Sequence, residues 1–170
     1  DYRGYGRSTG RPSERGLYRD AEAAYGYLVS ERKILPERII LYGESIGSAV
    51  AVDLASRHPV GGVILEGGFS SGRDIAGRIY PFIPPFLVSD IFNSLLKIPM
   101  VQSPKLFLHS RQDEVVPFSL AKKLFDAAVP PKTLVELQGG HNTSFIDSSR
   151  TYLSAIFSFI QSLVTAKTKG

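Results

Sequence analysis

The chain of 170 residues contains no cysteine, which excludes disulfide bonds, thiolate metal sites and a cysteine nucleophile. It also lacks any run of about 18 apolar residues, the length that a membrane-spanning helix needs. The apolar stretch 80–88 is shorter, and prolines interrupt it. No signal peptide opens the sequence. We therefore expect a cytoplasmic protein, with membrane attachment as the alternative if an anchor precedes Asp1.

An excess of one charge sign is also missing. Twenty Lys and Arg residues oppose 16 Asp and Glu residues, and the two signs are interleaved along the chain. Short basic pairs such as Lys122-Lys123 do not form a stripe that could follow a phosphate backbone, so we do not expect nucleic-acid binding. With 43% hydrophobic residues, the chain has the composition and length of one globular domain, residues 1–170.

Four short and almost wholly apolar segments predict strands at 39–42, 63–65, 106–108 and 134–137. Because polar residues do not alternate with the apolar ones, we expect strands buried on both faces, as in a parallel sheet covered by helices. Apolar residues at steps of three and four predict helices at 17–28, 46–58, 119–129 and 148–164. Ser13 is the expected N-cap of the first helix. This alternation predicts an α/β fold, in which sites form at the carboxyl ends of the strands.

The first predicted strand leads directly into Gly43-Glu44-Ser45-Ile46-Gly47, and a helix follows at once. So sharp a turn strains the serine backbone, and the flanking glycines prevent clashes. The hydroxyl is thereby placed at a helix start, where the N–H of Ile46 can face a developing oxyanion. This context predicts that Ser45 is a nucleophile. The alternative is an ordinary turn in which Ser45 caps the helix.

Asp113 follows the third predicted strand and is the candidate acid, because a serine–histidine pair needs a carboxylate that orients the imidazole. The alternative is that Asp113 caps the helix beyond Pro117 or is solvated. Glu66, at the end of the second strand, is the competing acid. Glu114 is adjacent to Asp113, but we expect its side chain to point away from the site.

His141 is the candidate general base, because Gly139-Gly140 allow the chain to turn just after the fourth strand. The two other histidines have simpler interpretations. His58 ends a helix, where a cation is favourable, and His109 ends the third strand and supports the acid-bearing loop. The resulting order, serine then acid then histidine, is the one found in alpha/beta-hydrolases.

The sequence resembles the alpha/beta-hydrolase superfamily along essentially its whole length, most closely the serine aminopeptidase-like or lysophospholipase-like subgroup, which includes protein depalmitoylases. Four segments carry the likeness: residues 1–8, residues 42–49 around Ser45, residues 113–117 and residues 140–141. The resemblance implies that the four strands are the C-terminal part of the fold. Early strands, and the loop with a second oxyanion donor, would then lie outside these residues. We accordingly expect the 170 residues alone to be poorly soluble and nearly inactive.

The segment 69–100 lies where this fold commonly inserts a cap, and it is strongly apolar. One interpretation is a lid over an apolar acyl group, with substrate-binding side chains at Tyr80, Phe82, Phe86 and Leu87. The other is that these residues simply pack on the sheet.

The leading functional hypothesis is hydrolysis of a small or lipid-like carboxylic ester or thioester through an acyl-enzyme on Ser45, without a metal or organic cofactor. A serine peptidase is the second hypothesis, and a truncated, non-catalytic fragment that serves as a binding module is the third. The sequence leaves the oligomeric state open.

Overall fold

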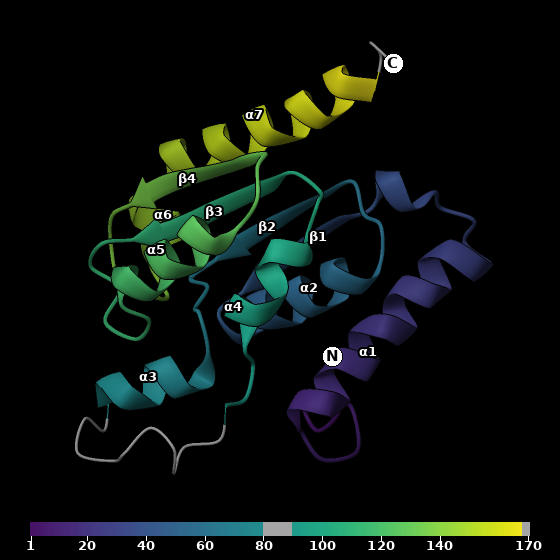
Figure 1. Cartoon of the computed structure of the whole chain (residues 1–170), viewed down its shortest axis with the longest axis horizontal. Helices are drawn as coiled ribbons and strands as arrows, with labels where there is room; N and C mark the ends of the chain where they lie inside the picture. The colour runs from purple at the N-terminus through teal and green to yellow at the C-terminus, as the bar shows by residue number, and fades with distance from the viewer. Residues whose placement is uncertain (80–89, 168–170) are drawn as a thin grey trace.

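The computed structural model describes residues 1–79 and 90–167, and it contains one parallel four-stranded sheet with strand order β1-β2-β3-β4 (Figure 1). The strands are β1 (Ile40–Glu44), β2 (Gly62–Glu66), β3 (Lys105–Ser110) and β4 (Lys132–Leu137). Each contains one of the four predicted apolar segments, apart from Ile39 just ahead of β1. The prediction of an α/β fold with a parallel sheet is confirmed.

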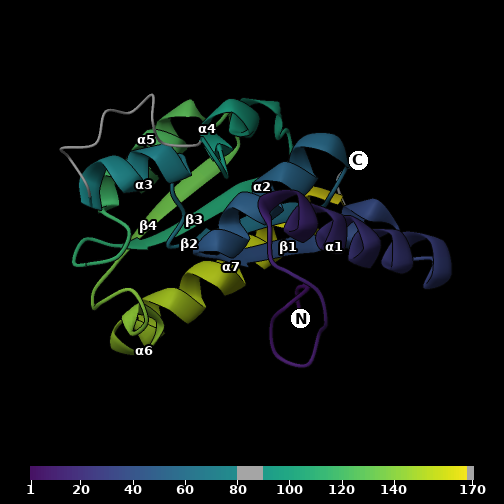
Figure 2. The same cartoon turned by 90° about the horizontal axis from the view of Figure 1, so that it is seen from below.

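Helices cover both faces of the sheet. Figure 2 shows α7 on one face and α2, α4 and α5 on the other, with α1 beside α2. The larger helices are α1 (Glu14–Gly26), α2 (Ile46–Arg57), α3 (Gly72–Ile79), α5 (Phe118–Ala127) and α7 (Ser149–Lys167). The short ones are a π-helical turn (Tyr27–Glu31), a 3₁₀ turn (Pro36–Arg38), α4 (Ser94–Lys97), a second 3₁₀ turn (Ile98–Met100) and α6 (Ser144–Asp147). No helix in the described residues combines the length and apolarity needed to cross a bilayer.

The first helix begins where the sequence predicts a cap. The Ser13 hydroxyl accepts a hydrogen bond from the Gly16 N–H at 3.1 Å, which satisfies one of the free donors of the first turn. Leu17 and Tyr25 form its buried face. Ahead of the helix, Arg3 binds Asp20 through both its backbone N–H and its guanidinium, at 2.8 and 2.6 Å, and so ties the N-terminal loop to α1.

Burial differs between the inner and outer strands, which corrects the expectation that all four are buried on both faces. Every residue of β2 and β3 is buried, whereas β1 and β4 keep intermediate and exposed positions. The reason is position in the sheet, because β1 pairs only with β2 and β4 only with β3 among the described residues. The core lies on both faces of the two inner strands, and α7 closes one of them.

The first residue of β3 is a fully buried lysine. The Lys105 ammonium donates to the carbonyl oxygens of Val101 and Ser103 at 2.8 and 2.7 Å. No carboxylate contacts it in the part of the chain that the structure describes. Burial, reinforced by the nearby charge of Lys132, lowers the pKa of Lys105 from 10.5 to about 8. The charged form therefore destabilises the folded state.

We expect Lys105 to make stability depend on alkaline pH. The unfolded chain binds the proton up to about pH 10.5 and the folded chain only up to about pH 8, so stability rises with pH across this window. Relative to Lys105→Met, wild type should gain on the order of 1–3 kcal/mol of unfolding free energy between pH 8 and pH 10.5. Urea denaturation at several pH values measures this gain. Lys122→Met, which removes an exposed lysine but keeps Lys105, should show the same gain as wild type. Parallel pH curves for wild type and Lys105→Met would contradict the assignment.

Candidate active site

Ser45 stands at a strained turn between β1 and α2. Its φ of 51° and ψ of −118° are unusual for a residue with a side chain. The turn brings the chain so close to itself that a Cβ on Gly43 would lie 2.2 Å from the Gly47 carbonyl oxygen. The Ser45 N–H donates to the Glu66 carbonyl at 2.8 Å, and the buried Ser48 hydroxyl donates to the Ser45 carbonyl at 2.6 Å. Both bonds hold the turn in its strained form.

Asp113 and His141 form a direct side-chain pair. The His141 Nδ1 lies 2.7 Å from Asp113 Oδ2, and their side chains are only 8% and 3% exposed. The other carboxylate oxygen, Oδ1, accepts the backbone N–H groups of Val115 and Val116 at 2.9 and 2.7 Å. The carboxylate is thereby held in one orientation. With Nδ1 engaged, Nε2 is the imidazole nitrogen left to act as a base.

Gly67, the residue after β2, lies between the serine turn and the imidazole. It follows Glu66, whose carbonyl accepts the Ser45 N–H, and a Cβ placed on it would lie 3.0 Å from His141 Cε1 and 3.8 Å from Asp113 Oδ2. Its φ of 54° also favours glycine. The structure thus brings the segments that bear the predicted serine, acid and histidine to one edge of the sheet.

Comparisons with known proteins concern the family and the fold of the chain. The chain is 40% identical over 162 residues to a Mycobacterium tuberculosis protein, and 38% identical over 161 residues to alpha/beta hydrolase domain-containing protein 17B of Homo sapiens. An alpha-beta hydrolase from Vibrio vulnificus superposes with a TM-score of 0.74 at 28% identity, over 94% of this chain and 61% of that one. The chain belongs to the alpha/beta hydrolases. A scan against protein-family models finds no match.

This chain spans little more than half the length of the curated relatives it matches. The two alignments cover 94% of this chain but 58% and 54% of the respective relatives. The fold likeness extends to an esterase from Pyrococcus furiosus, with a TM-score of 0.77 at 18% identity over 95% of this chain and 68% of that one. At that identity, the likeness concerns the fold alone.

The other two histidines of the hydrolase occupy structural positions. His109 is buried, its Nε2 lies 2.8 Å from the Val116 carbonyl, and it is 3.5 Å from Asp113 Oδ2. Burial lowers the pKa of His109, although the Val116 hydrogen bond opposes the shift. A neutral His109 therefore supports the acid loop, residues 111–117. His58 caps the end of α2 and pairs with Glu22 at 2.7 Å.

Glu66, the competing acid, faces away from His141. Its carboxylate accepts the Tyr152 hydroxyl at 2.9 Å and also the Tyr42 hydroxyl, so it lies on the α7 side of the sheet. Burial, together with the hydrogen bond to Glu66, raises the pKa of Tyr42, and burial likewise raises that of Tyr152. Both phenols stay protonated and can donate to the buried carboxylate.

The interpretation of Glu114 needs a correction. Its carboxylate does not point away, because Glu114 Oε2 accepts the backbone N–H of His141 at 3.0 Å. This contact forms because the loops after β3 and β4 lie close together at one end of the sheet, and no local sequence pattern indicates it.

The predicted substrate-binding residues Tyr80, Phe82, Phe86 and Leu87 lie outside the described residues, so that prediction stands untested. Of the predicted insertion 69–100, the structure describes α3, α4 and their flanks, and the Gly72 N–H donates to the Ile91 carbonyl at 2.8 Å across its base.

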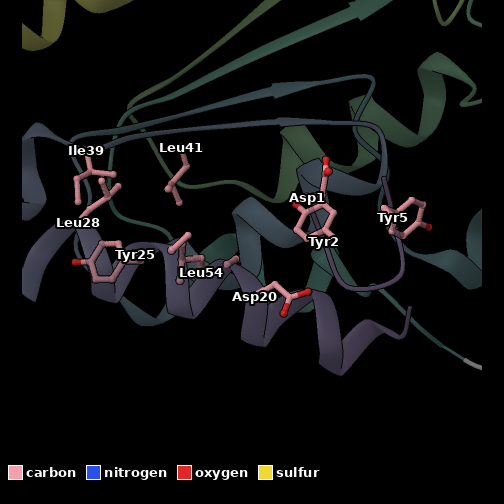
Figure 3. A pocket seen from close by; sticks show the side chains of 11 residues that line it. Asp1, Tyr2, Tyr5, Asp20, Tyr25, Leu28, Ile39, Leu41 and Leu54 are labelled. Atoms are coloured by element: carbon pink, nitrogen blue, oxygen red, sulfur yellow. The ribbon is translucent and has the colours of Figure 1, made fainter. Parts of the chain in front are cut away.

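A separate hollow of about 620 Å³ opens between α1 and β1 (Figure 3). Apolar side chains such as Leu28, Ile39 and Leu41 line much of it, with Asp1 and Asp20 among its polar groups. None of the residues Ser45, Asp113 and His141 borders this hollow. It therefore lies apart from the candidate active site.

Gly43→Ala tests how tightly the serine turn is packed. The added methyl group would overlap the backbone of Gly47, which cannot move without undoing the turn, so we expect a loss of more than about 2 kcal/mol of unfolding free energy in urea denaturation. Gly26→Ala is the matched control, because it adds the same methyl group to a helical site with nothing within 4 Å. That control should be neutral or gain up to about 1 kcal/mol. Equal effects of the two substitutions would disprove the close approach.

Proposed function

We propose that this chain carries the nucleophile, base and acid of a serine hydrolase, in the roles of Ser45, His141 and Asp113. The observation that supports this most is the 2.7 Å bond between His141 Nδ1 and Asp113, made at the same end of the sheet as a serine held at a strained strand-to-helix turn. A serine that only capped α2 would need neither feature. Its side chain in fact accepts no capping hydrogen bond.

In this proposal the reaction passes through an acyl-enzyme. Ser45 Oγ attacks the carbonyl carbon while His141 Nε2 takes the hydroxyl proton, and Asp113 stabilises the imidazolium that forms. The imidazolium then protonates the leaving alcohol or thiol. A water molecule, deprotonated by the same nitrogen, attacks the acyl-serine, which releases the acid and restores Ser45.

The main-chain N–H of Ile46 is the oxyanion donor that we assign. Ile46 is the first residue of α2, so its N–H has no acceptor within the helix and lies at the positive end of the helix dipole. Such a donor is worth roughly 100- to 1000-fold in rate.

We propose that the substrate is a carboxylic ester or thioester with an apolar acyl group. This ester would be a small molecule or a lipid-like compound. The apolar composition of the segment 69–100 supports this choice. A serine peptidase is the second candidate. It is less favoured because the sequence offers no arginine pair or acidic pocket to recognise a peptide terminus.

A fluorophosphonate probe tests the nucleophile directly. We expect wild type to be labelled at Ser45 and Ser45→Ala to remain unlabelled, because the probe reacts only with an activated serine. Ser154→Ala, which removes an exposed serine on α7, is the control and should be labelled like wild type. Unlabelled wild type, or equal labelling of Ser45→Ala, would refute the assignment.

Parallel assays with matched substrates test the class. Esters and thioesters of increasing acyl length should be hydrolysed with kcat/KM rising with acyl length, since each buried methylene contributes up to about 0.8 kcal/mol. Aminoacyl amides should be turned over far more slowly. A higher kcat/KM on the amides would instead identify a serine peptidase.

A further inference from the structure

The histidine loop, residues 139–141, is hydrogen-bonded to side chains at the end of β3 and in the loop that follows it. Gln112 Oε1 accepts the Gly139 N–H at 2.8 Å, and Glu114 Oε2 accepts the His141 N–H at 3.0 Å. The Ser110 hydroxyl donates to the Gly139 carbonyl. Asp113, between two of these residues, holds the imidazole. The acid loop therefore forms hydrogen bonds with both the main chain and the imidazole of the histidine loop.

Gly140 allows the Glu114 carboxylate to approach. A Cβ on Gly140 would lie 2.8 Å from Glu114 Oε2, closer than real contacts of this kind. Since Gly140 does not have a positive φ, a side chain here would meet only the end of the Glu114 side chain, which would have to move away from the His141 N–H. The absence of a side chain at Gly140 thus leaves room for the Glu114 carboxylate to accept the N–H of the following residue, His141.

We propose that Glu114 is a positioning residue that fixes the main chain of His141 while Asp113 fixes its imidazole. The catalytic consequence rests on the proposed function. One bond to Nδ1, at 2.7 Å, still lets the ring pivot about that contact, whereas a second bond, at 3.0 Å on the backbone of the same residue, removes the pivot. A misplacement of about 1 Å at a reacting group can cost on the order of 100-fold in rate.

Because Glu114 is exposed, its loss should leave the fold intact and act on the reaction step. An exposed hydrogen bond without a positioning role would change neither kcat nor the order of the histidine loop. These two interpretations differ in measurable ways.

The kinetic test compares Glu114→Ala with Glu114→Gln on a short-chain ester. In Glu114→Ala we expect kcat to fall about tenfold, with KM unchanged and a melting temperature within about 2 °C of wild type. Glu114→Gln should recover most of the loss, because its amide oxygen can accept the same N–H. Gly140→Ala should reproduce the Glu114→Ala defect, since its methyl group displaces the carboxylate.

Glu136→Ala is the matched control. Glu136 is another exposed carboxylate at this end of the sheet. It pairs with Arg111 at 2.5 Å, and its carboxylate forms no hydrogen bond with residues 139–141 in the described part of the chain. It should leave kcat unchanged. A kcat within twofold of wild type in Glu114→Ala, or no recovery in Glu114→Gln, would overturn the positioning role.

Amide hydrogen exchange, measured by NMR, tests the Glu114 contact independently of catalytic activity. The His141 amide should exchange at least tenfold faster in Glu114→Ala than in wild type or Glu136→Ala, because its acceptor is gone. Unchanged exchange would refute the contact itself. Should wild type fail both the labelling and the ester assays, the proposed function falls, and the exchange result alone decides whether Glu114 orders this loop.

Discussion

Parallel pairing of the four strands is the constraint on which the site depends. All four carboxyl ends lie at one edge of the sheet, with Glu44 opposite Glu66 and Leu108 opposite Val135 in the strand register. The loops that follow β1 to β4 consequently meet there, although they are far apart in sequence. The serine, Gly67, the acid and the histidine each follow a different strand. A sheet with any one strand reversed would send that loop to the opposite edge.

Close packing of the loops at this end of the sheet leaves no room for a side chain at two positions, and glycine occupies both. Gly43 lets the serine turn fold against Gly47, and Gly67 leaves room for the imidazole. The buried carboxylate of Asp113 is compensated by two backbone N–H groups and by His141, with a neutral His109 beside it. The bond between Asp113 and His141 joins two loops, so neither loop adopts its geometry alone. Buried polar groups tolerated here would be costly elsewhere in the core.

Much of this arrangement was predictable from local patterns. The unbroken apolar strands, the glycine-flanked serine before a helix and the order of serine, acid and histidine all reflect short-range rules of backbone geometry and burial. The depth of burial of β1 and β4 was not predictable, because an edge strand has the same apolar composition as an inner one. Lys105 shows the same limit, since its charged side chain reads as a surface residue until its place at the start of an inner strand is known.

The sequence by itself determined the class of fold, the four strands, the helices α1, α2, α5 and α7 and the three residues proposed for chemistry, because each depends largely on neighbours within a few positions. Only the tertiary structure decided between acids at the sheet edge. Glu66 turns toward Tyr42 and Tyr152 on the α7 face, Asp113 turns toward His141, and Glu114 reaches its backbone. The physical reason is that the partner of each of these side chains comes from a segment that is distant in sequence, so no local pattern can reveal it.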